Sequence, residues 1–286
     1  MTEDVARRYQ DLDLWPPEEV LMALLEAQLR AVAALWPALP ALKKAAVEAA
    51  ARMRQGGYLV YAGAGTSGRL AVLDGVELWP TFGFSRVRYL LAGGEKALLE
   101  AVEGAEDDLE GGLALGRSLG ERDVLLAVAA SGRTPFTLGV LRGAKARGAL
   151  TVALANNPGA PLLAEAHHPV LLLTGPEPIA GSTRLGAGTA QKVALNLFST
   201  LVMVLLGRVY GNRMARMRAQ NAKLRARGAA LVQELSGVSQ EEALALLEVY
   251  PEPALAALVA LGLEPGEALA LLEAKGVRGA LAEVGR

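Results

Sequence analysis

Residues 58–69 read YLVYAGAGTSGR, and this stretch decides the fold. The apolar run Tyr58–Ala62 has the length and composition of a buried strand. A glycine-rich turn follows at residues 63–68, and helical spacing resumes after it. A strand, a glycine-rich turn and a helix in this order predict an anion site at the N-terminus of the helix. The pattern G-x-G-x-x-G also occurs in dinucleotide-binding proteins. The residues that follow the other strands must therefore show whether the ligand is a dinucleotide or a simpler phosphate.

Four further apolar runs lie downstream, and helical stretches separate them. They are Val87–Ala92, Asp123–Ala129, Leu150–Ala155 and Pro169–Thr174. Continuously apolar strands that alternate with helices predict an α/β fold, a doubly wound parallel sheet with helices on both faces. Ligands of such sheets bind beyond the carboxyl ends of the strands, so the residues that follow each run form the candidate site.

A second hydroxyl-rich turn, SGRTP at residues 131–135, follows the third strand. Two such turns on neighbouring strands can surround one phosphate with hydroxyls, backbone N–H groups and helix N-termini. Taken singly, Ser131 and Thr134 could equally be ordinary helix caps. The second strand ends in Ala92-Gly93-Gly94, where a dinucleotide would need an acid for its ribose. The pair of turns therefore favours a phosphomonoester.

The composition excludes several kinds of chemistry. The chain has 286 residues, no cysteine and two histidines, so disulfides and zinc–thiolate sites are ruled out. His167 and His168 are adjacent before a strand and would point in opposite directions, so no metal site is expected. The formal net charge of −1 gives no reason to expect nucleic acid or an anionic membrane as a partner.

The same sequence gives expectations for localisation and domain organisation. Residues 1–13 are polar, unlike a signal peptide, and the apolar run Val193–Leu206 is too short for a membrane span, so a cytoplasmic protein is expected. We expect a helical arm at 1–55, an α/β domain with the phosphate site at 56–227 and a three-helix module at 228–286. The arginine-rich stretch 207–227 could face nucleic acid, but a solvated helix that pairs with nearby acids is favoured.

Several motifs carry a resemblance to known proteins. They are YAGAGTSGRLAVLD from Tyr61, EGAEDD from Glu103, AASGRTPF from Ala129 and GSTRLGAGTAQK from Gly181. Together they resemble the sugar isomerase (SIS) domain family of phosphosugar-binding proteins, and more narrowly the N-acetylmuramic acid 6-phosphate etherases. The resemblance implies a SIS-type, flavodoxin-like sheet, a phosphosugar ligand and a homodimer. The glucokinase regulatory protein, which binds phosphosugars without turnover, has the same motifs less completely.

The resemblance also implies an activity. The etherase family cleaves the lactyl ether of N-acetylmuramic acid 6-phosphate by elimination and hydration, without a cofactor or metal. The chemistry requires a base and an acid, and with no cysteine and so few histidines, carboxyls must supply both. The family's glutamates map onto Glu77 and Glu106, with Glu106 as the base at C2 and Glu77 as the acid. Without the resemblance, Glu106 is typical of a solvated acidic surface, and Glu77 could be buried and paired.

The resemblance marks further residues as substrate- and phosphate-binding: Gly65, Thr66, Ser67, Ser131, Gly132, Arg133, Thr134, Ser182, Thr183 and Lys192. Near these residues the chain departs from the family at Val76, Leu78, Trp79 and Gly186. The departures leave the exact substrate open within the phosphosugar class. A phosphosugar sensor without activity and an aldose–ketose isomerase therefore remain as alternatives.

The spacing of Ser67 and Glu77 bears on the assembly. Glu77 is ten residues beyond Ser67, and a helix of that length would place it about 15 Å along the axis from the phosphate loop. A sugar phosphate cannot easily bridge that distance within one subunit. We therefore expect the site to be shared between the two subunits of a homodimer, as the resemblance also implies.

Overall fold

The computed structural model describes residues 1–286, which form two compact units. The first unit comprises Met1–Gly75 and Arg86–Ser199. The second comprises Val76–Ser85 and Thr200–Arg286. A short segment from the α/β region, the one that carries Glu77, therefore packs with the C-terminal part of the chain.

The first unit contains a five-stranded parallel sheet. Its strands are β1 (Leu59–Gly63), β2 (Val87–Leu91), β3 (Val124–Val128), β4 (Leu150–Ala155) and β5 (His168–Leu171). The strand order β2-β1-β3-β4-β5 is the flavodoxin-like order, which confirms the predicted doubly wound parallel sheet. The fifth strand ends at Leu171, three residues before its predicted end at Thr174.

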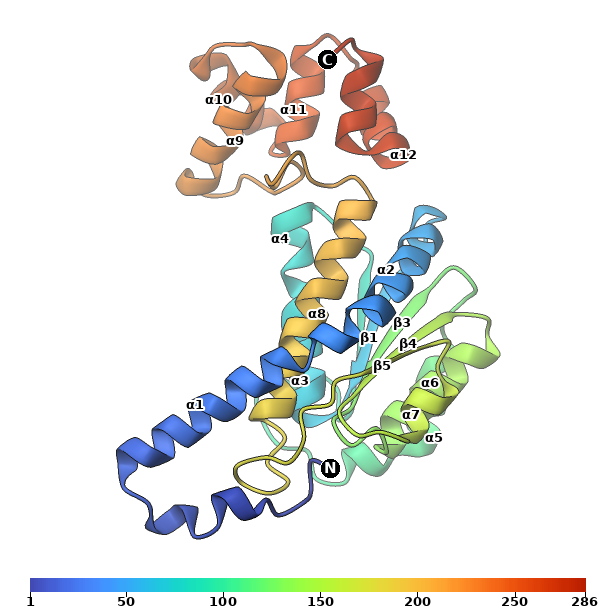
Figure 1. Cartoon of the computed structure of the whole chain (residues 1–286). Coiled ribbons are helices and arrows are strands. Elements are labelled where there is room, and N and C mark those ends of the chain that lie inside the picture. The colour runs from blue at the N-terminus through green and yellow to red at the C-terminus, as the bar shows by residue number, and fades with distance from the viewer. The chain divides into compact units, whose positions relative to one another are not determined.

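Helices cover both faces of this sheet (Figure 1). On one side lie α2 (Leu39–Arg54), α3 (Gly65–Val76) and α8 (Gly186–Leu205), and on the other α5 (Leu109–Gly116), α6 (Pro135–Ala146) and α7 (Pro161–Glu165). Every residue of β1, β3 and β4 is buried. This double coverage is the physical reason why these strands read as unbroken apolar runs.

The chain before the sheet is helical, with short 3₁₀ turns at Arg7–Tyr9, Leu12–Leu14 and Trp36–Ala38 around α1 (Pro17–Ala33) and α2. Helix α2 packs on the sheet. Helix α1 instead exposes a row of apolar side chains, Leu21, Met22, Leu25 and Leu29, each more than 60% exposed. This row is an uncovered apolar surface on the first unit.

Two helical stretches are long and apolar enough, by length and composition alone, to cross a membrane: Pro17–Arg54 and Gly186–Leu205. The predicted run Val193–Leu206 is thus part of a longer helix, α8, of 20 residues, so its length is no argument against a span. Helix α8 nevertheless buries Ala190, Ala194 and Phe198 completely. That burial is the packing of a core helix.

The second unit contains α4 (Leu78–Phe82) together with four C-terminal helices where three were predicted. These are α9 (Ala222–Ser236), α10 (Gln240–Val249), α11 (Pro253–Ala260) and α12 (Pro265–Glu283). Their core includes Val232, Leu247, Leu258 and Leu272. The last helix is broken at Gly276, where φ is 68° and the backbone lies against Gly207.

The arginine-rich stretch between α8 and α9 differs from its prediction. It is irregular rather than helical, and Arg208 and Arg216 are buried rather than solvated. The predicted pairing with nearby acids is confirmed, since Arg208 binds Glu273, Arg213 binds Glu234 and Arg216 binds Glu252.

Candidate active site at the carboxyl edge of the sheet

A cavity of about 220 Å³ lies just beyond the carboxyl ends of β1 and β2. Gly65 and Arg69 from the first turn of α3 line one part of it. Val102, Gly104 and Glu106 from the loop after β2 line the other. The structure therefore brings together a residue of the predicted phosphate loop and one of the two predicted catalytic glutamates.

Local backbone geometry places Glu106 in this loop. It sits in the 3₁₀ turn Ala105–Asp107, which begins after Gly104 at a φ of +70°. The side chain of Glu106 is exposed and forms no hydrogen bond or ion pair within the chain. The nearby Asp108 has a different task, because its carboxylate accepts the N–H of Gly111 and caps α5. Within this acidic run, Glu106 keeps its carboxylate free for a ligand.

Arg69 ties the Glu106 loop to the phosphate loop. Its Nε donates to the carbonyl of Ala97 at 2.8 Å, and Nη2 donates to that of Glu100 at 3.1 Å. Both carbonyls belong to the segment that leads to Glu106. Sequence reasoning missed Arg69, although its place directly after the glycine-rich turn was a signal that it could act at the same edge.

The first phosphate loop is tightly folded. Gly65 has a φ of +50°, and a Cβ on Gly68 would lie 2.2 Å from the side chain of Leu91. Ser67 is buried in the first turn of α3. The methyl group of Thr66 lies beside Gly188 of α8, 3.5 Å from where a Cβ would stand. Since Gly188 also donates to the carbonyl of Thr183 at 2.8 Å, the loop with Ser182 and Thr183 lies next to this turn.

The second phosphate loop follows β3, the neighbour of β1. The Oγ atom of Ser131 accepts the N–H of Arg133 at 3.2 Å, so its hydroxyl hydrogen is still available to a ligand. Gly132, at a φ of +64°, makes this turn possible. Thr134 occupies the N-cap position of α6, yet its side chain makes no capping hydrogen bond. Helix capping therefore does not account for Thr134.

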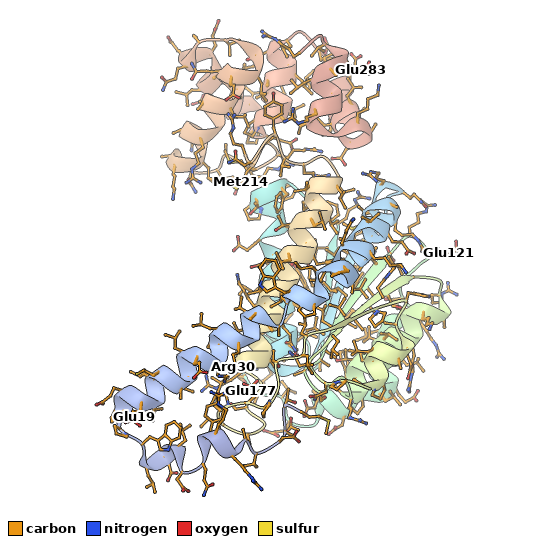
Figure 2. All side chains as sticks on the ribbon, in the orientation of Figure 1. Glu19, Arg30, Glu121, Glu177, Met214 and Glu283 are labelled. Atoms are coloured by element: carbon orange, nitrogen blue, oxygen red, sulfur yellow. The ribbon has the colours of Figure 1, made fainter.

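The N-terminus of α8 already holds a carboxylate. Glu177 is 2% exposed and accepts the N–H groups of Gly186 and Ala187, both at 2.8 Å; Figure 2 labels it on the loop before α8. This partner was not predicted from the sequence. Because these N–H groups are occupied, Ser182 and Thr183 would have to bind an anion by other groups.

A buried network lies beneath α3 and α8. Asp74 accepts hydrogen bonds from the hydroxyl of Tyr61 at 2.7 Å and from Asn196 at 2.6 Å. Lys192, a predicted binding residue, donates to Asn196 and is exposed on α8. Burial, together with the charge of Asp74, raises the pKa of Tyr89 to about 12. The network fixes the two helices that carry the predicted binding residues.

Glu77 belongs to the second unit, where it is the N-cap residue of α4. Its side chain is exposed and makes no hydrogen bond or ion pair, so it is neither buried nor paired. The stretch from Ser67 to Val76 is helical, as the argument from chain length assumed. Trp79, one of the departures from the family, stacks under the guanidinium of Arg218, 4.3 Å from the ring centre.

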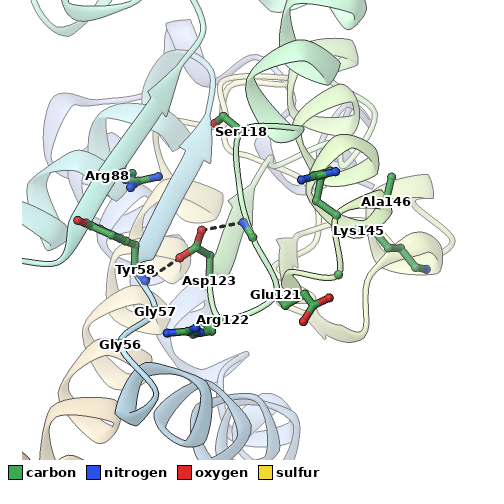
Figure 3. A pocket seen from close by; sticks show the side chains of 13 residues that line it. Gly56, Gly57, Tyr58, Arg88, Ser118, Glu121, Arg122, Asp123, Lys145 and Ala146 are labelled. Atoms are coloured by element: carbon green, nitrogen blue, oxygen red, sulfur yellow. Dashed lines mark hydrogen bonds between the residues drawn. The ribbon is translucent and has the colours of Figure 1, made fainter.

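A larger cavity, about 910 Å³, lies at the amino ends of the strands (Figure 3). Tyr58, Arg88, Arg122 and Lys145 line it, and Asp123 there accepts the N–H groups of Tyr58 and Gly120 at 2.9 Å. None of the predicted site residues lines it. Parallel α/β sheets bind ligands at the opposite edge, so the smaller cavity is the candidate site.

The two histidines have separate partners. His168 at the start of β5 is buried and contacts Glu48 through Nε2 at 2.7 Å. His167 accepts the N–H of Thr151 at Nδ1, at 3.1 Å. They belong to the packing of the sheet and lie apart from the candidate site residues.

Comparisons with known proteins identify the family of the fold. A SIS domain model matches residues 99–201, and a model of the glucokinase regulatory protein N-terminal SIS domain matches residues 41–145. The structure of a phosphoheptose isomerase from Francisella tularensis has a TM-score of 0.52 at 18% identity, covering 66% of this chain and 100% of that one. This likeness confirms the SIS-type fold.

Full-length relatives narrow the family. A protein from Deinococcus radiodurans named N-acetylmuramic acid 6-phosphate etherase is 52% identical over 281 residues, which cover 96% of this chain and 92% of the relative. One of the same name from Rubrobacter xylanophilus is 49% identical over 270 residues, covering 92% and 89%. With its flavodoxin-like sheet and relatives of this similarity, the chain belongs to the N-acetylmuramic acid 6-phosphate etherase family of SIS-domain proteins.

Proposed function

We propose that this chain is a carbon–oxygen lyase that cleaves the lactyl ether of N-acetylmuramic acid 6-phosphate. The products are N-acetylglucosamine 6-phosphate and D-lactate. The observation that carries the proposal is the shared cavity of Gly65 and Glu106, because it puts a free carboxylate beside a phosphate loop. The names of the relatives at about half identity support the same reaction.

The two hydroxyl-rich turns would hold the phosphate of the substrate. Ser67, Ser131 and Thr134 supply hydroxyl donors at the starts of α3 and α6, where helix N-termini also favour an anion. We assign further binding roles to Thr66, Gly132, Arg133, Ser182, Thr183 and Lys192, on the resemblance of their motifs. The phosphate would thus anchor the sugar at the carboxyl edge of the sheet.

Glu106 and Glu77 would carry out the proton transfers. In the open-chain aldehyde, Glu106 removes the proton from C2, and the bond from C3 to the lactyl oxygen breaks as Glu77 gives that oxygen a proton. Water then adds to C3 of the unsaturated aldehyde, and a proton returns to C2. The reaction consumes one water and needs no oxidant or reductant. Positioned acids and bases of this kind contribute about 10²–10⁴ in rate.

We further propose a homodimer in which each active site takes Glu106 from one subunit and Glu77 from the other. The helical stretch from Ser67 to Val76 and the uncovered apolar row of α1 support this assembly. We also propose that residues 56–227 form the phosphosugar-binding domain, with helical segments at 1–55 and 228–286 on either side of it in the sequence. The protein would act in the cytoplasm, where its phosphorylated substrate would be held.

Mixing two inactive variants tests the shared site. Heterodimers of Glu77→Gln and Glu106→Gln hold one site with both glutamates and one with neither, so activity should partly return after subunit exchange. If exchange is confirmed by a tagged subunit and no activity returns, both glutamates come from one chain. The two homodimeric variants, incubated separately, are the control.

The match to the glucokinase regulatory protein N-terminal SIS domain favours a second candidate, a phosphosugar-binding regulator without turnover. The free carboxylate in the cavity argues against it, because a regulator has no need of a base. An aldose–ketose isomerase, the remaining alternative, would use a base without releasing lactate.

One assay separates these functions. Purified protein incubated with N-acetylmuramic acid 6-phosphate should release D-lactate and N-acetylglucosamine 6-phosphate in equal amounts. The unphosphorylated sugar should react far more slowly, because it lacks the anchoring phosphate. Tight binding of the phosphosugar without lactate would favour the regulator, and a ketose product would favour the isomerase.

A further inference from the structure

The segment that carries Glu77 is short and depends on distant residues. Helix α4 has five residues, and isolated helices of this length are unstable in water. Its last carbonyls have no partner within the helix. At Gly83 the chain turns with a φ of +62°. The residues that hold this segment lie after α8, in the part of the chain with which the segment forms one compact unit.

Arg208 binds the C-terminal end of α4. Its guanidinium donates from Nη1 to the carbonyls of Phe82 at 3.1 Å and Gly83 at 3.2 Å. Its Nη2 donates to both carboxylate oxygens of Glu273 in α12, at 2.8 Å each. One buried side chain thus joins the helix beginning at Glu77 to the last helix of the chain.

A second arginine completes the cluster. Arg216 is 2% exposed and binds Glu252 at 2.5 Å and Glu273 at 2.8 Å. The backbone of Gly83 packs directly on this pair, since a Cβ at Gly83 would lie 2.6 Å from the carbonyl of Arg216. We call Arg208, Arg216, Glu252 and Glu273 the arginine–glutamate cluster.

A third arginine holds the other side of the helix. The N–H of Arg218 donates to the carbonyl of Pro80 at 3.2 Å, and its guanidinium stacks on Trp79. The backbone that follows Glu77 is therefore fixed at three carbonyls by residues of the second unit. Trp79, a departure from the family pattern, is part of this support.

The nature of the cluster indicates what it contributes. A buried ion pair adds little net stability, since desolvation offsets the attraction, and apolar residues of similar volume often do as well. Here Oε2 of Glu252 is buried without a hydrogen bond and has only a 3.6 Å ion pair with Arg218. A contribution to stability therefore does not readily explain why these buried charges are present. The hydrogen bonds from Arg208 to two particular carbonyls do explain it.

We propose that Arg208, held by the arginine–glutamate cluster, is a positioning residue that orients Glu77 for proton donation to the leaving lactate. The C-terminal helices then take part in catalysis by way of α12 rather than forming a passive appendage. The inference rests on the proposed function, in which Glu77 is the acid.

The test compares two steps of the reaction in Arg208→Lys. A lysine has one compact ammonium group and cannot bond two carbonyls and a carboxylate in a fixed plane. Misplacement of a catalytic group by about 1 Å costs on the order of 10²-fold. We expect lactate release to fall by about that factor, with KM and the exchange of the C2 proton with D₂O unchanged, because exchange needs Glu106 alone.

A purely structural role gives a different pattern. If Arg208 only stabilised the fold, exchange and lactate release would fall together, in proportion to the unfolded fraction, and the proposal would be wrong. Glu273→Gln is a milder second variant, since Glu273 is half exposed; it should give the same pattern with a smaller loss. Arg213→Met is the matched control, because Arg213 pairs with Glu234 on the surface and does not touch α4.

A double variant separates this inference from the proposed function. In a Glu77→Gln background, Arg208→Lys should cause little further loss, because the group that it positions is already gone. Full additivity of the two losses would overturn the inference. If Glu77→Gln itself does not slow lactate release, the assignment of Glu77 as the acid has failed instead.

Discussion

Glu106 and Glu77 lie in two different units but are supported in the same manner. In each case an arginine bonds carbonyls of the segment that carries the glutamate and leaves the carboxylate free. Arg69 does this for Glu106 and is itself partly exposed. Arg208 does it for Glu77 and is buried and fixed by Glu273.

The two supports differ in the number of arginines that provide them. The Glu106 loop consists of 3₁₀ turns; Arg69 bonds its carbonyls, and Ala105 packs against the core beside α6. The Glu77 segment is bound at three carbonyls by two arginines, Arg208 and Arg218, from the stretch between α8 and α9. We infer that the loop of the base depends more on a single arginine than the segment of the acid does. Of the four predictions below, those on the glutamates and on Arg69 test this contrast, and the other two test the phosphate site and the sheet unit.

The largest effect is expected from removing either carboxylate. Glu106→Gln and Glu77→Gln should each lower the rate of lactate release by about 10²–10⁴, because each removes one proton transfer. Binding of the phosphosugar, measured by calorimetry, should change little. Since both side chains are exposed and unpaired, the melting temperatures should stay close to that of the parent. A loss of binding equal to the loss of rate would contradict these roles.

Ser131→Ala should act on binding rather than on chemistry. Its hydroxyl hydrogen is free to donate to a phosphate, and a hydrogen bond to a charged group contributes about 1.5–3 kcal/mol. The dissociation constant of the phosphosugar should therefore rise by about 10- to 150-fold. Ser118→Ala is the control, because Ser118 lies at the opposite edge of the sheet. Equal affinities of the two variants would argue against the second loop as a phosphate site.

Arg69→Met tests the support of the Glu106 loop. The change removes two hydrogen bonds to the loop that leads to Glu106, so the C2 proton exchange should slow, by about tenfold if the loop shifts by less than 1 Å. Arg122→Met removes a comparable bond, to the carbonyl of Gln55, at the other edge of the sheet and should leave the exchange unchanged. An unaffected exchange rate in Arg69→Met would show that the loop holds its shape without this arginine.

The smallest effect concerns the pH dependence of folding in the first unit. Burial and the charge of Lys145 lower the pKa of His167 below its usual value of 6.5. The unfolded chain thus binds more protons as the pH falls from 7 to 5, and the folded state loses stability over that range. His167→Gln should flatten this decline only slightly in urea titrations, because His167 is exposed and solvent screens its interactions. A steeper decline would contradict the sign.

The sheet could be predicted because its physics is local. Strands buried on both faces must be apolar throughout, and β4 was placed at its exact residues for that reason. The positions of the hydroxyl-rich turns could be predicted in the same way, because they directly follow apolar strands, although Ser131 and Thr134 taken singly could also be helix caps. The end of the fifth strand was less clear, because Leu173 and Thr174 beyond it remain apolar or β-prone, although Leu173 is exposed and Thr174 is half-buried.

The second unit could not be predicted in the same way. Arginine is rarely buried, so a run of seven basic residues read as a solvated helix. The acids that bury Arg208 and Arg216 lie at Glu252 and Glu273, far along the chain, and the carbonyls that Arg208 binds lie at Phe82 and Gly83. No sequence periodicity relates positions so far apart, so only the three-dimensional structure shows how the segment that carries Glu77 is held.

The most direct test of the roles proposed for the two glutamates follows the C2 proton of the substrate. The variants Glu106→Gln and Glu77→Gln are incubated with substrate in D₂O, and deuterium at C2 and free D-lactate are both measured. For Glu106→Gln we expect deuterium incorporation and lactate release to be slowed together, by about 10²–10⁴. For Glu77→Gln we expect deuterium at C2 in unreacted substrate, with only lactate release slowed. Deuterium incorporation by Glu106→Gln at the parent rate would contradict the assignment of Glu106 as the base.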